Sequence, residues 1–408
     1  MITGPLIVVG VGADGWSGLG ERARAAVLAA EEIVGSERQL ALVPTTSAKL
    51  RPWPSPMDPL VEELIERAEA GTGAAVCVLA SGDPMLHGIG ATLARRLAPD
   101  RLAVHPHPSA FALACARLGW PTAEVELVSA VARAPEVVAR VLQPGRRLIA
   151  YTTGAGGAAA LAHVLREQGF GPSRFVVLEQ LGGPNERVLE SSAQEWGGTE
   201  TDPLHCVAIE CRAEDGVGLR PLVAGLPDDA YESDGQLTKR HVRAITLAAL
   251  APTPGALLWD VGAGSGSISI EWLRAEPTAR AIAVERDEVR AERARVNART
   301  LGVPQLEVVT GRAPEALHDL PGPDAIFIGG GLTTVGTIDR CWKSLRPGGR
   351  IVANAVTLEG ERMLAGIRER CGGGLVRIEI AHAEPIGSFE AWRAQLPVVQ
   401  WSARKERA

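Results

Sequence analysis

The sequence lacks long hydrophobic runs, cysteine pairs and an excess of positive charge, and each absence excludes a class of protein. No apolar stretch reaches the roughly 18 residues that a membrane span needs. The net charge of −6 argues against nucleic acid as the main partner, because phosphate binding relies on a broad basic surface. The cysteines form no CxxC pair and no metal-ligand spacing; they stand at positions 77, 115, 206, 211, 341 and 371. Such a set is typical of buried, reduced thiols in a cytoplasmic protein.

The first residues also lack a basic segment and a small-residue cleavage site, so we expect no secretory signal and a cytoplasmic location. With 408 residues, 46% of them apolar and 22% charged, the chain is typical of a folded protein of two or three domains.

Short apolar runs alternate with helix-like stretches, which predicts two α/β halves with mostly parallel sheets. In the first half a helix is predicted at 21–35, and strands are predicted at 6–12, 74–80, 101–106, 146–153, 174–181 and 205–211. In the second half a helix at 239–250 precedes strands at 256–262, 281–285, 306–311, 324–329 and 350–356. Residues 377–386 and 395–403 are predicted to form a closing antiparallel pair.

A stretch rich in glycine, proline and acidic residues, from about 213 to 236, marks the predicted domain boundary. We therefore expect a first domain at 1–212, a linker at 213–233 and a second domain at 234–408.

A glycine-rich turn, WDVGAGSGS at 259–267, follows the first predicted strand of the second half. Small residues between a buried strand and a helix let a ligand approach the backbone. The dinucleotide fingerprint GxGxxG would place its third glycine at Ser267, whereas Asp260, Gly262, Gly264 and Gly266 form the DxGxGxG pattern of class I S-adenosylmethionine (SAM) methyltransferases. Glu285 closes the second strand, where a carboxylate can accept both ribose hydroxyls. The alternative is a tight turn that binds no ligand.

The segment after the fourth strand of this half, IFIGGGLTT at 326–334, lacks the Asn/Asp-Pro-Pro-Tyr turn of enzymes that methylate amino groups in nucleic acids. The predicted methyl acceptor is therefore a carbon or an oxygen of a small molecule.

A second glycine turn, GVGADG at 10–15, does satisfy GxGxxG, so a dinucleotide site is one interpretation. Its context argues against that interpretation. SGDPMLHGIG at 81–90 follows a buried strand and combines a tight turn with a carboxylate at Asp83, and HPSAFALACARLGWP at 107–121 begins another helix after a strand.

In this context, the segments VVGVGADGW, LASGDPMLHG, PSAFALACARLG and ERVLESSAQEW resemble the tetrapyrrole methylase family. QLTKRHVRA, WDVGAGSGSISIEW and AVERD resemble the decarboxylating precorrin methyltransferases of the class I group. The two resemblances together cover nearly the whole chain. They imply a two-lobed tetrapyrrole methylase fold followed by a Rossmann-like, doubly wound sheet. They also imply a bifunctional enzyme of cobalamin biosynthesis. Its first domain would methylate C5 of precorrin-6B (also called precorrin-6Y), and its second would methylate C15 and remove the carboxyl of the C12 acetate, giving precorrin-8.

The resemblance also implies one SAM per domain and no metal. In the first domain the implied SAM contacts are Gly10, Gly12, Gly82, Asp83, Ser109, Ala110, Thr153 and Leu181. In the second they are Thr238, Asp260, Gly262, Gly264, Gly266, Glu285, Gly311 and Ala313. The chain departs from the family patterns at Ala13, at His87 and at Arg312, which stands where an acidic residue often meets the adenine.

The segment TKRHVR at 238–243 predicts a basic helix start, with Thr238 as the cap. Cations in a first turn oppose the helix dipole, at a cost of a few tenths of a kcal/mol each. We therefore expect Lys239, Arg240 and Arg243 to hold carboxylates of the substrate; the alternative is a solvated basic turn.

A metal site at His105 and His107 is disfavoured, because Pro106 and Pro108 interrupt that strand. The expected partner is a small tetrapyrrole, with no nucleic acid and no membrane, and the expected assembly is a homo-oligomer. Two further hypotheses stay open: a two-domain methyltransferase for another small anionic molecule, and a SAM-binding regulator without activity.

Overall fold

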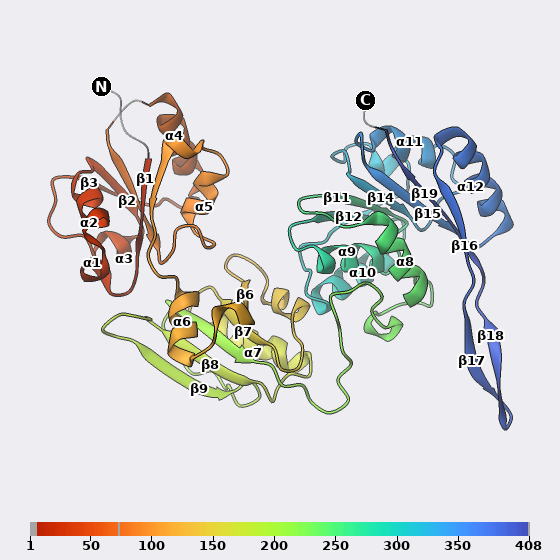
Figure 1. The fold of residues 1–408 in the computed structure, drawn as a ribbon, viewed down its shortest axis with the longest axis horizontal. Helices are drawn as coiled ribbons and strands as arrows, with labels where there is room; N and C mark the ends of the chain where they lie inside the picture. Colours follow the sequence, from red (N-terminus) through yellow and green to blue (C-terminus); the bar gives the residue numbers. More distant parts are fainter. Residues whose placement is uncertain (1–5, 72–73, 407–408) are drawn as a thin grey trace. The chain divides into compact units, whose positions relative to one another are not determined.

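The computed structural model describes residues 6–71 and 74–406, and the chain divides into two compact units (Figure 1). The first unit contains residues 1–135 and 144–214. The second contains residues 215–408 together with the short segment 136–143. The division near 214 falls inside the stretch whose composition predicts a linker, whereas the transfer of residues 136–143 to the second unit has no signal in the sequence.

The first sheet of the first unit is entirely parallel, in the order β3-β2-β4-β1-β5. Its strands are β1 (Leu6–Val11), β2 (Glu32–Gly35), β3 (Lys49–Pro52), β4 (Val76–Ser81) and β5 (Leu102–His105). The accompanying helices are α1 (Gly15–Gly18), α2 (Glu21–Leu28), α3 (Glu37–Leu40), α4 (Asp58–Ala70), α5 (Ile89–Ala94) and the 3-10 turn η1 (Pro99–Arg101). The single helix predicted at 21–35 is wrong. The β-branched Ile33 and Val34 are fully buried and belong to β2, which explains why the helix stops at Leu28.

The second sheet of this unit is mixed, in the order β6-β7-β10-β8-β9. Its strands are β6 (Val125–Ser129), β7 (Arg147–Tyr151), β8 (Arg174–Glu179), β9 (Arg187–Ser192) and β10 (His205–Glu210). The accompanying helices are α6 (Ala110–Leu118), η2 (Thr122–Glu124) and α7 (Gly157–Glu167). The 3-10 turn η3 (Pro135–Arg140) lies between β6 and β7 in the chain, but its residues after Pro135 belong to the second unit. Only β6 and β7 pair in parallel, so the predicted mostly parallel arrangement holds for the first sheet and not for the second.

The second unit is a doubly wound sheet of seven strands in the order β13-β12-β11-β14-β15-β19-β16. The strands are β11 (Leu257–Val261), β12 (Arg280–Glu285), β13 (Glu307–Thr310), β14 (Ala325–Ile328), β15 (Arg350–Ala355), β16 (Gly374–Ile378) and β19 (Val398–Arg404). All neighbours pair in parallel except β19, which is antiparallel to β15 and β16. The helices are η4 (Asp228–Ala230), α8 (Arg240–Leu250), α9 (Ser267–Ala275), α10 (Glu288–Thr300), η5 (Glu315–Leu317), α11 (Thr337–Ser344) and α12 (Leu358–Cys371).

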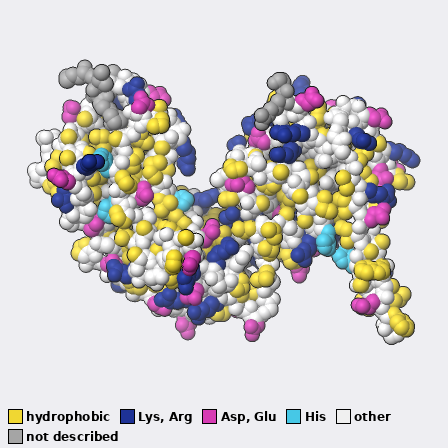
Figure 2. Space-filling view, viewed as in Figure 1, with side chains coloured by type: hydrophobic (Ala, Val, Ile, Leu, Met, Phe, Trp, Pro, Cys, Tyr) yellow, Lys and Arg dark blue, Asp and Glu magenta, His cyan; other side chains and the backbone are white. Residues whose placement is uncertain are grey.

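A separate two-stranded ribbon, β17 (Ala381–Ile386) and β18 (Phe389–Ala394), projects from this unit (Figure 1). The predicted closing pair is therefore only partly right. Residues 374–378 do pair with β19, but residues 381–386 pair with their own neighbour β18 instead. The ribbon exposes Phe389 (77%) and Trp392 (78%), and Figure 2 shows hydrophobic side chains along it.

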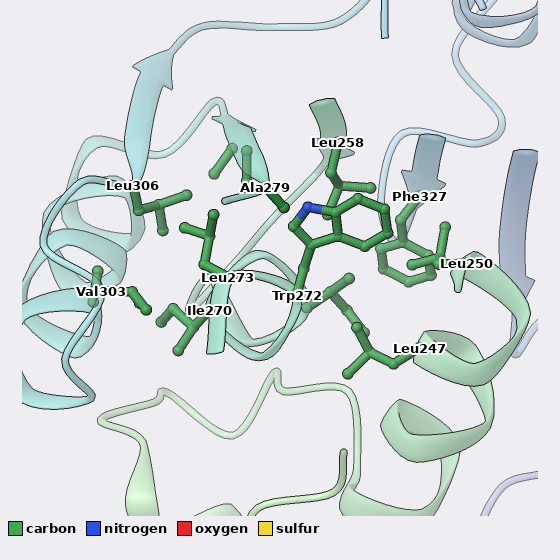
Figure 3. Packing of buried hydrophobic residues seen from close by; sticks show 14 of the residues in the cluster. Leu247, Leu250, Leu258, Ile270, Trp272, Leu273, Ala279, Val303, Leu306 and Phe327 are labelled. Atoms are coloured by element: carbon green, nitrogen blue, oxygen red, sulfur yellow. The ribbon is translucent and has the colours of Figure 1, made fainter. Parts of the chain in front are cut away.

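The core of the second unit surrounds Trp272 of α9, which is 1% exposed and packs among Leu247, Leu258 and Phe327 (Figure 3). The Trp272 indole N–H donates to the Arg280 carbonyl at 3.1 Å, so its polar atom is satisfied in the core. Two residues of the predicted linker, Leu226 and Tyr231, belong to the same core. Part of that segment is thus a component of the second unit and not a free connection.

Within the described residues, no helix is long and apolar enough to cross a membrane. All six cysteines are free thiols, and only Cys371 is not fully buried.

Candidate functional sites

The second unit contains a cavity of about 910 Å³ at the carboxyl ends of the parallel strands. Ligands of open α/β sheets bind at this edge, where the strand order reverses. Six of the predicted SAM contacts line the cavity: Thr238, Gly262, Gly264, Glu285, Gly311 and Ala313. The cavity is closed on other sides by Gly329–Gly331 after β14, by Asn354 and by residues 395–396.

The turn after β11 follows a path that requires glycine. Gly262, Gly264 and Gly266 all have positive φ, at 72°, 57° and 77°. A Cβ added to Gly262 would lie 2.5 Å from the Gly330 Cα, so this turn and the glycine loop after β14 approach without side chains between them. The Gly262 and Ala263 amides both donate to the Val284 carbonyl, which holds the turn in place while its outer side stays open to the cavity.

Glu285 lies at the end of β12 and is 5% exposed. Its Oε2 accepts the Gly264 N–H at 2.8 Å, and its Oε1 accepts the Asp287 N–H at 3.0 Å. The carboxylate is thereby fixed on the cavity wall beside the glycine turn, with acceptor capacity left for hydroxyl groups of a ligand. This geometry fits the ribose of SAM.

Asp260 does not line the cavity, contrary to the sequence prediction. It is 1% exposed, and its Oδ2 accepts both the N–H (3.1 Å) and the Oγ–H (2.8 Å) of Ser269 in α9. Burial raises the pKa of Asp260 to about 6. The carboxyl therefore fixes the start of α9 behind the glycine turn. Gly266 is likewise absent from the cavity wall; a Cβ added there would lie 3.0 Å from the Ala294 side chain of α10.

Arg243 contradicts the prediction that it holds a substrate carboxylate. Its side chain is 0% exposed, and its Nε donates to Glu271 Oε1 at 2.5 Å. Its Nη groups donate to the Asp228 carboxylate at 3.2 Å and to the carbonyls of Thr238 and Leu226. Every part of the guanidinium is bound within the fold, so none of it is available to a substrate.

Lys239 and Arg240 have different positions at the start of α8. Both side chains are exposed, and Lys239 lines the cavity whereas Arg240 does not. The predicted cap is off by one residue, because Lys239 is the N-cap and α8 begins at Arg240. The reason lies in Arg243, whose side chain binds the Thr238 carbonyl and whose amide N–H donates to the Lys239 carbonyl. Two further cations, Arg286 and Arg290, line the cavity and were not predicted from the sequence.

The first unit contains a smaller cavity, of about 490 Å³, lined by residues of both of its sheets. Six predicted SAM contacts line it: Gly12, Gly82, Asp83, Ser109, Ala110 and Leu181. Gly10 and Thr153 do not. A Cβ at Gly10 would lie 2.1 Å from the Gly82 carbonyl oxygen, so the close approach of these two turns requires glycine at this position. Thr153 is exposed and accepts the Ala132 N–H at 3.2 Å, while its neighbour Thr152 lines the cavity.

Tyr151, at the end of β7, also lines this cavity and was missed by the sequence analysis. Its hydroxyl oxygen accepts the Phe111 N–H of α6 at 2.9 Å. Burial raises the pKa of Tyr151 to about 12, so the phenol stays protonated near neutral pH. The sequence signal for this residue was a tyrosine at the end of the apolar run RRLIAY, but the neighbouring residues do not indicate which way its side chain points.

Of the two histidines considered for a metal, His107 is the one with a carboxylate neighbour among the described residues. His107 Nε2 lies 3.2 Å from Asp14 Oδ2. No group of three or more histidine, cysteine, aspartate or glutamate side chains with metal-binding geometry occurs among residues 6–71 and 74–406.

Comparisons with known proteins match the two units separately and the chain as a whole. Residues 5–196 match the family model described as tetrapyrrole (corrin/porphyrin) methylases, and residues 229–405 match that of the precorrin methyltransferase domain. A curated Sinorhizobium protein named precorrin-6Y C(5,15)-methyltransferase [decarboxylating] is 46% identical over 98% of this chain and 96% of its own length. A Mycobacterium tuberculosis protein of the same name is 45% identical over 98% of this chain and all of its own length.

A shorter relative from Pyrobaculum calidifontis is named probable cobalt-precorrin-6B C(15)-methyltransferase (decarboxylating). It is 38% identical over 33% of this chain and 71% of its own length. The full-length matches, together with two cavities built on two different methyltransferase architectures, place this chain in the precorrin-6Y C(5,15)-methyltransferase (decarboxylating) family.

Proposed function

We propose that this chain methylates precorrin-6Y at C5 and C15 and removes one carboxyl group, using a separate SAM site in each unit. The activity follows from membership of the family, whose curated members match nearly the whole chain. The proposal of two SAM sites is supported by one observation above all: each unit has its own cavity, and each cavity is lined by residues that the resemblance assigns to SAM. Precorrin-8 would be the product.

We further propose a division of labour, with C5 methylation in the first unit and C15 methylation with decarboxylation in the second. The shorter relative from Pyrobaculum supports it, because that protein is named for C15 methylation with decarboxylation and matches only a third of this chain. The match of residues 229–405 to a precorrin methyltransferase domain also supports it.

Methyl transfer from SAM requires mainly that the two reacting groups are correctly positioned. SAM, when bound, supplies an activated methyl group, and a reduced tetrapyrrole carbon is an enamine-type nucleophile. The protein has to hold the two reacting atoms about 3 Å apart and in line. In the second unit Glu285 and the glycine turn at 262–264 would orient the cofactor, and Lys239 on the cavity wall would hold a carboxylate of the macrocycle.

Decarboxylation also restricts which carboxylate of the substrate the charged residues can bind. Loss of CO₂ leaves an electron pair that the conjugated system of the substrate can absorb. A tight ion pair with the departing carboxylate would stabilise the ground state more than the transition state, because charge leaves that group during the reaction. Lys239 is therefore proposed to hold a carboxylate that stays on the macrocycle.

Incubation of the full chain with the precorrin and SAM tests the activity. Two added methyl groups and one released CO₂ per macrocycle are expected, measured by mass spectrometry and trapping of labelled CO₂. A single methyl group would contradict the use of two sites. No transfer to the precorrin, with transfer to another small anion, would favour the alternative substrate.

Expression of residues 215–408 alone tests the division of labour. The fragment should begin before residue 225, because the Gly225 and Leu226 amides donate to the buried Glu271 carboxylate. It should add one methyl group and release CO₂. The fragment omits residues 136–143, which belong to the second unit, so its folding is first checked by circular dichroism. If the folded fragment methylates C15 only when the first unit is supplied, the proposed division is wrong.

A homo-oligomer, a small tetrapyrrole as the partner and a cytoplasmic location stay predictions. The exposed Phe389 and Trp392 of the β17–β18 ribbon support self-association, because large exposed apolar side chains mark interaction surfaces. Sedimentation of the wild type and of a Phe389→Ser, Trp392→Ser variant checks this: the variant should sediment as a smaller species.

A further inference from the structure

Arg38 is the only lysine or arginine among the described residues that line the cavity of the first unit. It belongs to the short helix α3, on the side of the cavity formed by the first sheet, and its side chain is half-buried. Its Nη2 donates to Ser81 Oγ at 3.0 Å, and the neighbouring Gln39 donates to the same oxygen at 3.1 Å. Ser81 directly precedes Gly82 and Asp83. The guanidinium is thus held in a defined orientation beside the expected cofactor contacts.

This guanidinium has no carboxylate partner within the described part of the chain. The carboxylate with the strongest influence on it is that of Asp202, which is too distant for an ion pair. Both Asp202 oxygens already accept hydrogen bonds, from the Gln180 side chain at 3.0 Å and from the Leu204 N–H at 2.7 Å. Burial lowers the pKa of Arg38, yet arginine keeps its proton in proteins. A partly desolvated cation without a counter-ion is unfavourable unless a ligand supplies the negative charge.

Part of the cavity lining near Arg38 is not assigned to SAM. The predicted SAM contacts Ser109, Ala110 and Leu181 come from α6 and from the end of the second sheet. Ser36, Arg38, Gln39 and Trp53 also line the cavity and are not among the predicted SAM contacts, although Gly82 and Asp83 directly follow Ser81, to which Arg38 donates. Trp53 contributes an aromatic side chain to the cavity lining, and the paired N–H groups of the Arg38 guanidinium match the two oxygens of a carboxylate.

We propose that Arg38 binds a peripheral carboxylate of the tetrapyrrole in the first unit and thereby determines which edge of the macrocycle enters the C5 methylation site. The inference rests on the proposed function and adds a substrate-binding residue to it. It predicts a contact with the methyl acceptor and none with SAM.

The test compares Arg38→Gln with Arg38→Lys in the full chain. Glutamine can still donate a hydrogen bond to Ser81 but has no charge. Lysine keeps the charge but lacks the planar pair of N–H donors that a guanidinium offers to a carboxylate. Initial rates of C5 methylation are measured against tetrapyrrole and against SAM, with the methyl position read by fragmentation mass spectrometry. Arg38→Gln should raise the KM for the tetrapyrrole roughly ten- to hundredfold and leave the KM for SAM unchanged. Arg38→Lys should recover part of this loss.

Arg22 provides the matched control, because it is exposed on α2 of the same unit and does not line the cavity. Arg22→Gln should behave as the wild type. An unchanged tetrapyrrole KM in Arg38→Gln would overturn the inference, as would an equal loss in Arg38→Lys and Arg38→Gln or a parallel rise in the KM for SAM. If the wild-type chain itself fails to methylate C5, the proposed function is wrong and this inference with it.

Discussion

The Arg243 guanidinium lies 2.5 Å from the Glu271 carboxylate, and the two side chains are 0% and 2% exposed. Glu271 also accepts hydrogen bonds from the amides of Gly225 and Leu226 and from the Tyr231 hydroxyl. This buried pair therefore joins the segment before α8 to helix α9, which begins at the glycine turn. Through the Thr238 carbonyl it also positions the residues that enter the cavity wall.

Breaking this pair should destabilise the second unit strongly. Arg243→Ala would leave the Glu271 carboxylate buried without its cation, at an expected cost of about 3–5 kcal/mol in the free energy of unfolding. The exposed pair of Arg370 and Asp339, 3.1 Å apart, is the control, because Arg370→Ala should have little effect. Urea unfolding of both variants measures the difference. Equal losses of unfolding free energy in the two variants would show that the buried Arg243–Glu271 pair does not hold the segment before α8 in place.

The pKa of Asp260 predicts a pH dependence of stability. The folded state keeps this proton up to about pH 6, whereas the unfolded chain releases it near 3.8. Because the folded state binds more protons in between, this contribution to stability is complete below pH 3.8 and is lost as the pH rises through 6. Relative to Asp260→Asn, the wild type should lose about 2 kcal/mol between pH 4 and pH 7. Hydrogen exchange of β11 amides in both proteins checks this; a constant difference across that range would contradict it.

Glu285 predicts a selective loss of cofactor affinity. Calorimetric titration of the wild type should give two SAM molecules per chain. Glu285→Ala should weaken one of these sites roughly ten- to hundredfold and leave the other unchanged, because the carboxylate contacts only one cavity. Glu288→Ala, an exposed change at the start of α10, is the control. A single site in the wild type, or weakening of both sites in Glu285→Ala, would disprove the two-site proposal.

Lys239 and Arg240 should differ in kinetics although they are neighbours. Lys239→Ala should raise the KM for the tetrapyrrole in C15 methylation about five- to thirtyfold with kcat nearly unchanged, as expected for uniform binding. Arg240→Ala should have a smaller effect, since Arg240 does not line the cavity. Methyl transfer and CO₂ release are followed separately. Loss of CO₂ release with normal methylation in Lys239→Ala would instead make Lys239 a direct participant in decarboxylation.

The sequence alone determined the features that depend on neighbours in the chain. The glycines at 262–266 follow a buried strand and Glu285 ends the next one, and parallel strands bring their carboxyl ends to one edge of the sheet. The position of both residues on one cavity wall could therefore be predicted. Gly82 and Asp83 follow a buried strand in the same way, and the family resemblance implied that they contact SAM; both line the other cavity.

Only the tertiary structure decided which charged residues face a ligand. Lys239 and Arg243 lie four residues apart in one basic segment, yet one lines the cavity and the other is bound to Glu271, 28 residues further along the chain. Asp260 belongs to the glycine motif but does not line the cavity. Tyr151 and Arg38 both line the cavity of the first unit, although no local sequence pattern connects the two elements that carry them. The physical reason is that distant residues decide whether a charged side chain is buried in an ion pair or stays available to a ligand, because they supply its partner and exclude water from it.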